Sequence, residues 1–171
     1  MCGKLLGQQI SQANIFYLLD LVDKYDCKEL AAQCGGFLAS NFAPILAENK
    51  KRVLSLPVET WVAMLKSDDL LVATEHELFD TVMQYVSPFD QPKKKAALEQ
   101  LLPHVRWCYM PMKYLSQTIE KDKFLCSLSC TPALLFETYR YKVREKTLWH
   151  TYAHTPYSLH IGLSAECTEK L

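Results

Sequence analysis

The sequence has no excess of charge of either sign. Its 19 basic and 19 acidic residues give a formal net charge of +0 at pH 7. Proteins that bind nucleic acids or anionic membranes through charge carry a basic excess or a basic patch. The one basic run, at Lys93, Lys94 and Lys95, has no interleaved aromatic residues, so we interpret it as a solvated face. The charge balance therefore predicts neither a nucleic acid nor a membrane as the partner.

The sequence also lacks long apolar runs and the short motifs of common enzymes. No run approaches the ~18–20 apolar residues that a membrane span requires, and the opening MCGKLLGQQIS has no signal-peptide core. Phosphate-binding glycine loops, H-E-x-x-H, G-x-S-x-G and EF-hand patterns are absent. Because 49% of the 171 residues are hydrophobic and 22% are charged, a globular core is expected. We predict a non-enzymatic protein of the cytoplasm or nucleus, with no cofactor.

The cysteines do not form a recognisable framework. There are seven, an odd number, and without a secretion signal we expect reduced thiols. Cys126 and Cys130 are four residues apart, and no C-x-x-C pair completes a zinc set. His150, His154 and His160 have a spacing that matches no standard metal site. We therefore predict structural thiols and no metal, with a site at these five residues as the open alternative.

One cysteine and one histidine are spaced like a nucleophile and its base. His104 and Cys108 are four residues apart, which on a helix brings two side chains together. However, Pro103 and Pro111 bracket them, and no third group is present to orient the histidine. We interpret Cys108 as a packing residue, and an activity lost on changing it would support the enzyme alternative.

The clearest secondary-structure signals lie between Val53 and Val86. Ser55 and Pro57 are typical of a helix start, and apolar residues then recur at helical spacing at Val58, Trp61, Val62 and Leu65. Thr74 and Glu77 have the spacing of a capping box for a second helix. We expect its buried face to comprise Leu78, Phe79, Val82, Tyr85 and Val86, with Glu75, His76 and Glu77 in solvent.

Similar patterns predict further helices on both sides. The first spans residues 12–25, with a stripe at Ile15, Leu18, Leu19, Val22 and Tyr25, and Asp26 is the expected cap of the second. Others are expected at 43–54, 93–102, 112–119, 120–129 and 131–145, the last capped by Thr131. Three apolar residues of the first helix are candidates for partner binding: Phe16, Tyr17 and Leu21. For Phe16 and Tyr17, core packing is the alternative.

Proline residues bound a segment that we expect to be extended, from His104 to Pro111. Val105, Trp107 and Met110 are its predicted core side chains. Arg106 lies among these apolar residues, so we expect a carboxylate or a helix-end carbonyl to hold it, with Asp68 or Asp69 as the partner. From residue 146 the apolar periodicity ends, and we expect a poorly ordered tail or one that packs on sequence absent from this chain.

Three ordered segments resemble the BACK domain, an all-helical module that follows a BTB domain in kelch-type proteins. They are NIFYLLDLVDKYDCKELAAQCGGFLASNF (14–42), LSLPVETWVAMLKSDDLLV (54–72, continuing into TEHELFDTVMQYV) and LLPHVRWCYMPMKYL (101–115). Trp107 and Cys108 depart from the family's usual Phe and Pro. The resemblance implies an all-α, BACK-like array of antiparallel helix pairs over residues 12–119. Residues 1–11 are then an N-terminal extension, 120–145 additional helices and 146–171 the tail.

The resemblance also implies a function. BTB proteins of this kind are adaptors of cullin-RING ubiquitin ligases, in which the BTB domain dimerises and holds the cullin while the first BACK helices add to that surface. We therefore expect a protein-interaction scaffold that contacts a cullin when linked to a BTB domain. A general assembly module of a BTB protein unrelated to ubiquitin is the alternative. Because no kelch signature and at most the end of a BTB domain are present, we expect a fragment, a short isoform or a divergent member.

Overall fold

The computed structural model describes residues 9–153, with side chains to residue 145, and this part of the chain contains helices and no strands. The all-α prediction is confirmed. The helices are α2 (Ile15–Tyr25), α3 (Lys28–Ser40), α4 (Phe42–Val53), α5 (Val58–Leu65), α6 (Glu75–Val86), α7 (Gln91–Leu101), α8 (Met112–Tyr114), α9 (Lys123–Cys126) and α10 (Thr131–Ala153). Short 3₁₀ turns, η1 (Leu102–His104) and η2 (Trp107–Tyr109), and a π-helical turn, η3 (Leu115–Ile119), lie between α7 and α9.

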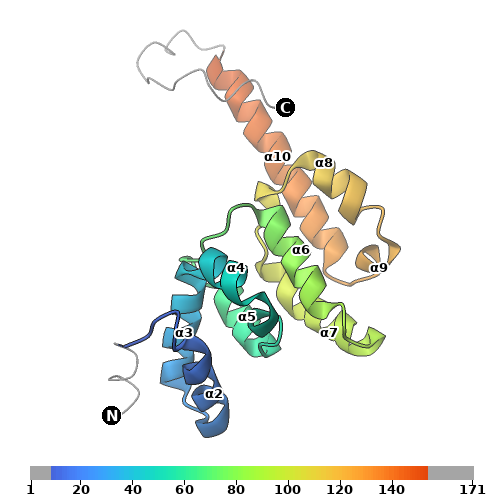
Figure 1. Cartoon of the computed structure of the whole chain (residues 1–171). Coiled ribbons are helices and arrows are strands. Elements are labelled where there is room, and N and C mark those ends of the chain that lie inside the picture. Colours follow the sequence, from blue (N-terminus) through green and yellow to red (C-terminus); the bar gives the residue numbers. More distant parts are fainter. Residues whose placement is uncertain (1–8, 154–171) are drawn as a thin grey trace.

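The helices stack in succession along an elongated molecule. α2 packs on α3, α3 on α5, α5 on α7, and α6 on α7. The described chain therefore begins at one end of the stack, and α10 leaves it at the other, against η2 and α9 (Figure 1). Among the described residues no single helix has the length and apolar composition of a membrane span. α3 and α4 reach that length and composition only as a pair, and the pair is bent by 111°.

The predicted stripes form one continuous core. In α5 and α6, the buried side chains Trp61, Leu65, Phe79 and Val82 are those that the spacing predicts. The cap at Thr74 is confirmed, since the Glu77 N–H donates to Thr74 Oγ1 at 3.4 Å. Val105, Trp107 and Met110 are buried as expected, although η1 and η2 make the segment from residue 104 to 111 a pair of tight turns rather than an extended stretch.

Several predicted helix ends differ from those observed. Ser55 donates to the Arg52 carbonyl at the end of α4 instead of capping α5. Asp26 ends α2 in the left-handed conformation (φ 49°), so Cys27 rather than Asp26 precedes α3. Tyr25 was placed on the buried stripe and is 62% exposed. Thr131 is the first residue of α10, which continues to Ala153 rather than ending at residue 145. The rest of the tail, with His154 and His160, lies outside the described residues.

Aromatic side chains from three helices meet at the centre of the molecule. Trp61 is completely buried, with ring centroids 6.0 Å from Phe42 of α4 and 5.0 Å from Tyr85 of α6. The Tyr85 hydroxyl donates to the Leu56 carbonyl at 2.9 Å in the α4–α5 connection, so the cluster is tied to the backbone. Burial raises the pKa of Tyr85 to about 12, so the hydroxyl keeps its proton as a donor. This cluster joins α4, α5 and α6.

Trp61→Ala should destabilise the protein by about 3–5 kcal/mol, because it removes the largest buried side chain of the cluster and leaves a cavity. Urea unfolding followed by circular dichroism measures this loss. An unchanged unfolding midpoint would show that Trp61 is not packed as described.

The two buried tryptophans provide a matched comparison. Trp107 Nε1 donates to the Leu102 carbonyl at 2.8 Å, whereas Trp61 Nε1 has no acceptor among the described residues. Trp107→Phe leaves the Leu102 carbonyl without that donor, while Trp61→Phe breaks no hydrogen bond. We expect Trp107→Phe to cost about 1–2 kcal/mol more than Trp61→Phe. Equal losses would contradict the hydrogen-bond assignment.

Two adjacent glycines lie inside α3 and differ in their surroundings. A Cβ on Gly35 would be 3.7 Å from the Cβ of Ala63 on α5, an ordinary van der Waals contact, so only a side chain larger than a methyl group would collide there. A Cβ on Gly36 would meet nothing within 4 Å. Gly36 therefore carries the entropic cost of glycine in a helix without a packing reason.

Gly36→Ala should stabilise the protein by about 1 kcal/mol, because alanine restricts the unfolded chain and fits the helix without a clash. Thermal unfolding measures the gain as a higher Tm. Gly35→Leu is the control: its larger side chain collides with α5 and should lower the Tm. A lower Tm for Gly36→Ala would show that this position is packed.

Candidate protein-interaction surfaces

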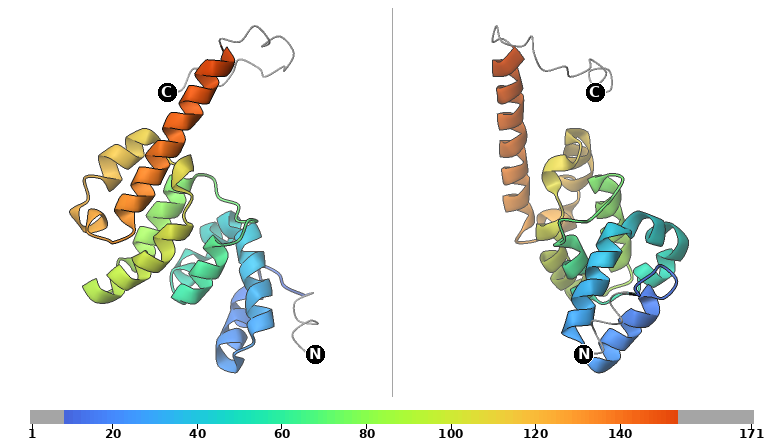
Figure 2. Two further views of the ribbon diagram at one scale, coloured as in Figure 1. Left: turned by 180° about the vertical axis from the view of Figure 1, so that it is seen from behind. Right: turned by 90° about the vertical axis from the view of Figure 1, so that its left-hand side faces the viewer.

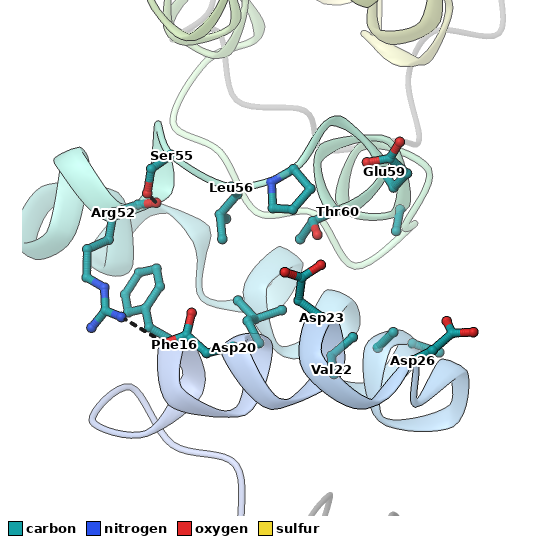
Figure 3. Close-up of a pocket in the computed structure, with 15 residues that line it drawn as sticks. Phe16, Asp20, Val22, Asp23, Asp26, Arg52, Ser55, Leu56, Glu59 and Thr60 are labelled. Atoms are coloured by element: carbon teal, nitrogen blue, oxygen red, sulfur yellow. Dashed lines mark hydrogen bonds and ion pairs between the residues drawn. The ribbon is translucent and has the colours of Figure 1, made fainter.

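A groove of about 690 Å³ lies between α2 and α5, with α3 at its base. Its apolar lining comes from Leu19, Val22, Ala31, Ala32, Leu56, Pro57 and Ala63. Figure 3 shows α2 along one side of the groove and the α4–α5 connection with α5 along the other. α2 packs on α3 rather than directly on α5, which leaves the groove between α2 and α5.

Carboxylates surround this apolar floor. Asp20, Asp23 and Asp26 follow one another along α2 and its end, and Glu59 lies across the groove on α5 (Figure 3). The spacing of three residues keeps Asp20 and Asp23 on neighbouring faces of the helix. Of these four, Asp20 has a cationic partner, Arg52, with Nη2 3.4 Å from Oδ2. The groove therefore combines an apolar floor with an acidic rim, a combination that suits an apolar segment bearing basic side chains.

Arg52 closes one end of the groove. Its guanidinium lies 4.8 Å from the centroid of the Phe16 ring, in a cation–π arrangement, while it also pairs with Asp20. Both side chains of the ion pair are largely exposed, at 57% and 72%, so the pair adds little to stability. Its effect is local, since it covers Phe16 and neutralises one carboxylate.

The three predicted partner-binding residues are in different environments. Phe16 is only 6% exposed and lines the groove beneath Arg52. Tyr17 is 64% exposed, and Leu21 is half-buried against the core. Neither Tyr17 nor Leu21 lines the groove. Core packing, the alternative for Phe16, is what the structure shows, whereas Tyr17 is available to a partner.

The sequence interpretation missed the acidic rim. The spacing of Asp20, Asp23 and Asp26 was visible in IFYLLDLVDKYD as three carboxylates on the polar side of one helix. Glu59 and Arg52 belong to other helices, and only the packing of α2 beside α5 brings them to the same groove. No local pattern predicts that proximity.

An ion pair between a buried carboxylate and a partly exposed arginine joins the start of α6 to the turn that precedes η2. Glu75 was expected in solvent but is 6% exposed, and one of its oxygens accepts from the Arg106 N–H at 3.4 Å. The other lies 3.9 Å from Arg106 Nη1. Arg106 also donates to the Ser67 carbonyl at 3.3 Å, so the predicted helix-end carbonyl is correct, while Glu75 takes the place predicted for Asp68 or Asp69.

Burial makes this carboxylate costly to ionise. Desolvation raises the pKa of Glu75 above its ordinary value of 4.5, against the opposing effects of the Arg106 N–H and guanidinium. The folded state therefore binds a proton more tightly than the unfolded state. The contribution of Glu75 to stability is complete below the unfolded pKa and is lost as the pH rises through the folded pKa.

The unfolding free energy of the Glu75→Gln variant should increase relative to that of the natural protein as the pH rises from 4 to 7. Glutamine accepts the Arg106 N–H without carrying a buried charge, and it does not titrate. Urea unfolding at both pH values gives the difference in unfolding free energy between the two proteins. Glu77→Gln, the same change at an exposed neighbouring position, is the control. A variant whose unfolding free energy falls relative to that of the natural protein between pH 4 and pH 7 would contradict the direction of the pKa change.

The residues of the alternative chemical sites belong to different elements or lie outside the described residues. His104 ends η1 and Cys108 lies in η2, so they do not share a helix. Cys126 donates its thiol to the carbonyls of Ile119 and Glu120, at 3.7 and 3.4 Å. Between residues 9 and 145, no three His, Cys, Asp or Glu side chains are grouped to hold a metal ion. The five cysteines in that range, Cys27, Cys34, Cys108, Cys126 and Cys130, are free thiols.

Comparison with known proteins agrees with this architecture. The family model BACK, described as "BTB And C-terminal Kelch", matches residues 15–120, from the start of α2 to the end of η3. The chain belongs to the BACK family. A BACK domain is a protein-interaction module, and the groove between α2 and α5 lies entirely within the matched residues.

Several kelch-like proteins are relatives. Human Kelch-like protein 6 is 32% identical over 125 residues, which cover 72% of this chain and 20% of the relative. Zebrafish Kelch-like protein 24a is 30% identical over 142 residues, covering 83% and 23%. Rat Kelch-like protein 2 is 24% identical over 140 residues, covering 82% and 23%. The chain thus spans between a fifth and a quarter of the length of these relatives.

Proposed function

We propose that this chain is the scaffold module of a BTB adaptor for a cullin-RING ubiquitin ligase, without enzymatic activity of its own. The BACK match over residues 15–120 and the kelch-like relatives support this role. In it, the chain acts in the cytoplasm or nucleus and binds proteins rather than nucleic acid, membrane or a cofactor. The observation that carries the proposal is the acid-rimmed groove on the first BACK helices.

The groove and Tyr17 supply the contact with the cullin. An apolar segment of the cullin N-terminal region occupies the floor at Leu19, Val22 and Leu56. Basic side chains on that segment face Asp23 and Glu59, which are exposed on opposite sides of the groove. Exposed charges of this kind contribute more to the association rate and to specificity than to affinity.

The size of this contact limits what the chain does alone. A floor of a few small apolar side chains and an acidic rim stabilise a complex by a few kcal/mol, which is comparable with the entropy lost on association. We infer that the groove strengthens a cullin complex that a linked BTB domain has already formed. In that arrangement the second contact is intramolecular and its entropic cost is largely removed.

The isolated 171-residue chain should bind a cullin N-terminal region weakly or undetectably, and the same chain fused behind a BTB domain should bind more tightly than the BTB domain alone. Isothermal titration calorimetry measures the three affinities. In the fusion, Asp23→Lys combined with Glu59→Lys should remove the gain and its dependence on salt concentration. Tyr17→Ser tests the exposed aromatic residue; Phe16 is unsuitable because it is buried.

Glu48→Lys is the control for the charge reversals, since Glu48 is exposed on α4 and does not line the groove. It should leave the affinity unchanged. Tight binding by the isolated chain would show that the BTB domain is not required. A fusion that binds no better than the BTB domain would contradict the cullin contact and favour an assembly module unrelated to ubiquitin. A gain that survives the double reversal would exclude the groove as the site of the contact.

A further inference from the structure

Arg52 fills one end of the groove between α2 and α5 from within the chain. It projects from the last turn of α4 toward α2 (Figure 3). Its guanidinium lies 4.8 Å from the centroid of the Phe16 ring, and its Nη2 lies 3.4 Å from Asp20 Oδ2. Phe16 and Asp20 are four positions apart on α2, so they are neighbours on one side of the helix. Together they present an aromatic face and a carboxylate to a single guanidinium.

An aromatic face beside a carboxylate suits an arginine from any source. The planar guanidinium stacks on aromatic rings and pairs with carboxylates, whereas the compact ammonium of lysine stacks less well. Phe16 is buried, and Arg52 and Asp20 are 57% and 72% exposed. The Arg52 side chain can therefore turn into solvent while both residues of α2 keep their places on the helix.

The contacts that hold Arg52 are weak enough to be replaced. An exposed ion pair and an exposed cation–π contact each contribute little to stability. An arginine of a partner makes the same two contacts with Phe16 and Asp20, so the exchange loses neither of them. The released guanidinium of Arg52 regains its hydration.

The charge of the groove favours this exchange. Four of the described lining residues are carboxylates, Asp20, Asp23, Asp26 and Glu59, and Arg52 is the one basic side chain among them. Negative charge is therefore in excess even while Arg52 is in place. A basic partner complements this charge, and an acidic partner is repelled by it.

We propose that Phe16 and Asp20 form an arginine subsite, which Arg52 occupies in the free protein and an arginine of the partner takes over on docking. The groove extends from Phe16 to Asp26, about 15 Å along α2, a length that an extended segment of about five residues spans. The partner is a short apolar segment with an arginine at one end and a second basic residue at the other. This inference rests on the proposed use of the groove for docking, and it adds the chemistry of the partner and a competitor within the chain.

Arg52 thereby lowers the affinity of the groove for its partner. A site that is open in only a fraction of the molecules binds with an apparent affinity reduced by that fraction. Removing the Arg52 side chain should therefore tighten the binding of a segment that contains arginine. The gain should be smaller for a segment of the same shape without the guanidinium charge.

Fluorescence anisotropy with a labelled peptide of about six residues tests the proposal. The peptide has an apolar centre, an arginine at one end and a lysine at the other. In its counterpart, citrulline, which is neutral and of nearly the same shape, replaces the arginine. Arg52→Ala should tighten the binding of the arginine peptide by about three- to tenfold, and that of the citrulline peptide by less.

Lys51→Ala is the matched control. It removes the same charge from an exposed neighbouring position on α4 that does not line the groove. Because exposed charges are screened by salt, this variant should change the affinity by less than about twofold. The comparison separates the loss of a competitor at Phe16 and Asp20 from a general change in charge.

Two further variants identify the subsite. Arg52→Lys keeps a competitor that stacks less well on Phe16, so its affinity for the arginine peptide should lie between those of the natural protein and Arg52→Ala. Asp20→Asn, added to Arg52→Ala, should remove the preference for arginine over citrulline. Because Arg52 and Asp20 are exposed, all variants should keep their helical circular dichroism. If Arg52→Ala loses it, Arg52→Lys against the natural protein is the deciding comparison.

Equal affinities of Arg52→Ala and Lys51→Ala for the arginine peptide would overturn the proposal. So would equal binding of the two peptides to Arg52→Ala, or a preference for arginine that survives Asp20→Asn. Binding of neither peptide would overturn it as well, and would show that a segment of the same chain or a second copy fills the groove. A groove that selects arginine, beside a BTB fusion that binds the cullin no better than the BTB domain, would contradict the proposed function alone.

Discussion

The close packing of aromatic rings around Trp61 is the constraint on which the arrangement of the helices depends. Trp61 contacts Phe42 and Tyr85, which belong to helices on either side of α5 in the chain. Large rings tolerate only a few mutual orientations, so their contact fixes the relative positions of the helices that carry them. The Tyr85–Leu56 hydrogen bond extends this constraint to the α4–α5 connection. That connection contributes Ser55, Leu56 and Pro57 to the lining of the groove.

A second cluster of aromatic rings fixes the relative positions of the elements in the C-terminal half of the described chain. Phe79 of α6 contacts the rings of Trp107 and Tyr114, at 5.9 and 6.1 Å. The Trp107 N–H, donated to the Leu102 carbonyl, holds η2 against the end of α7. The ion pair between the buried Glu75 and the partly exposed Arg106 joins the start of α6 to the turn before η2. α10 packs on η2, as the views in Figure 2 show, so these contacts also hold the surface against which α10 packs.

Local patterns in the sequence were sufficient to predict the helices, most buried side chains of α5 and α6, and the capping by Thr74. Periodicity and caps depend on residues within a few positions of one another, so the sequence alone contains them. The BACK resemblance supplied the order of the helices. Tertiary structure alone decided the burial of Glu75 and Phe16, since their partners Arg106 and Arg52 lie 31 and 36 positions away in the chain. It also decided that Asp23 and Glu59 share one groove, and that Phe136 remains exposed on a helix with apolar residues on most sides. Such pairings depend on how helices pack, and no pattern within a single helix encodes them.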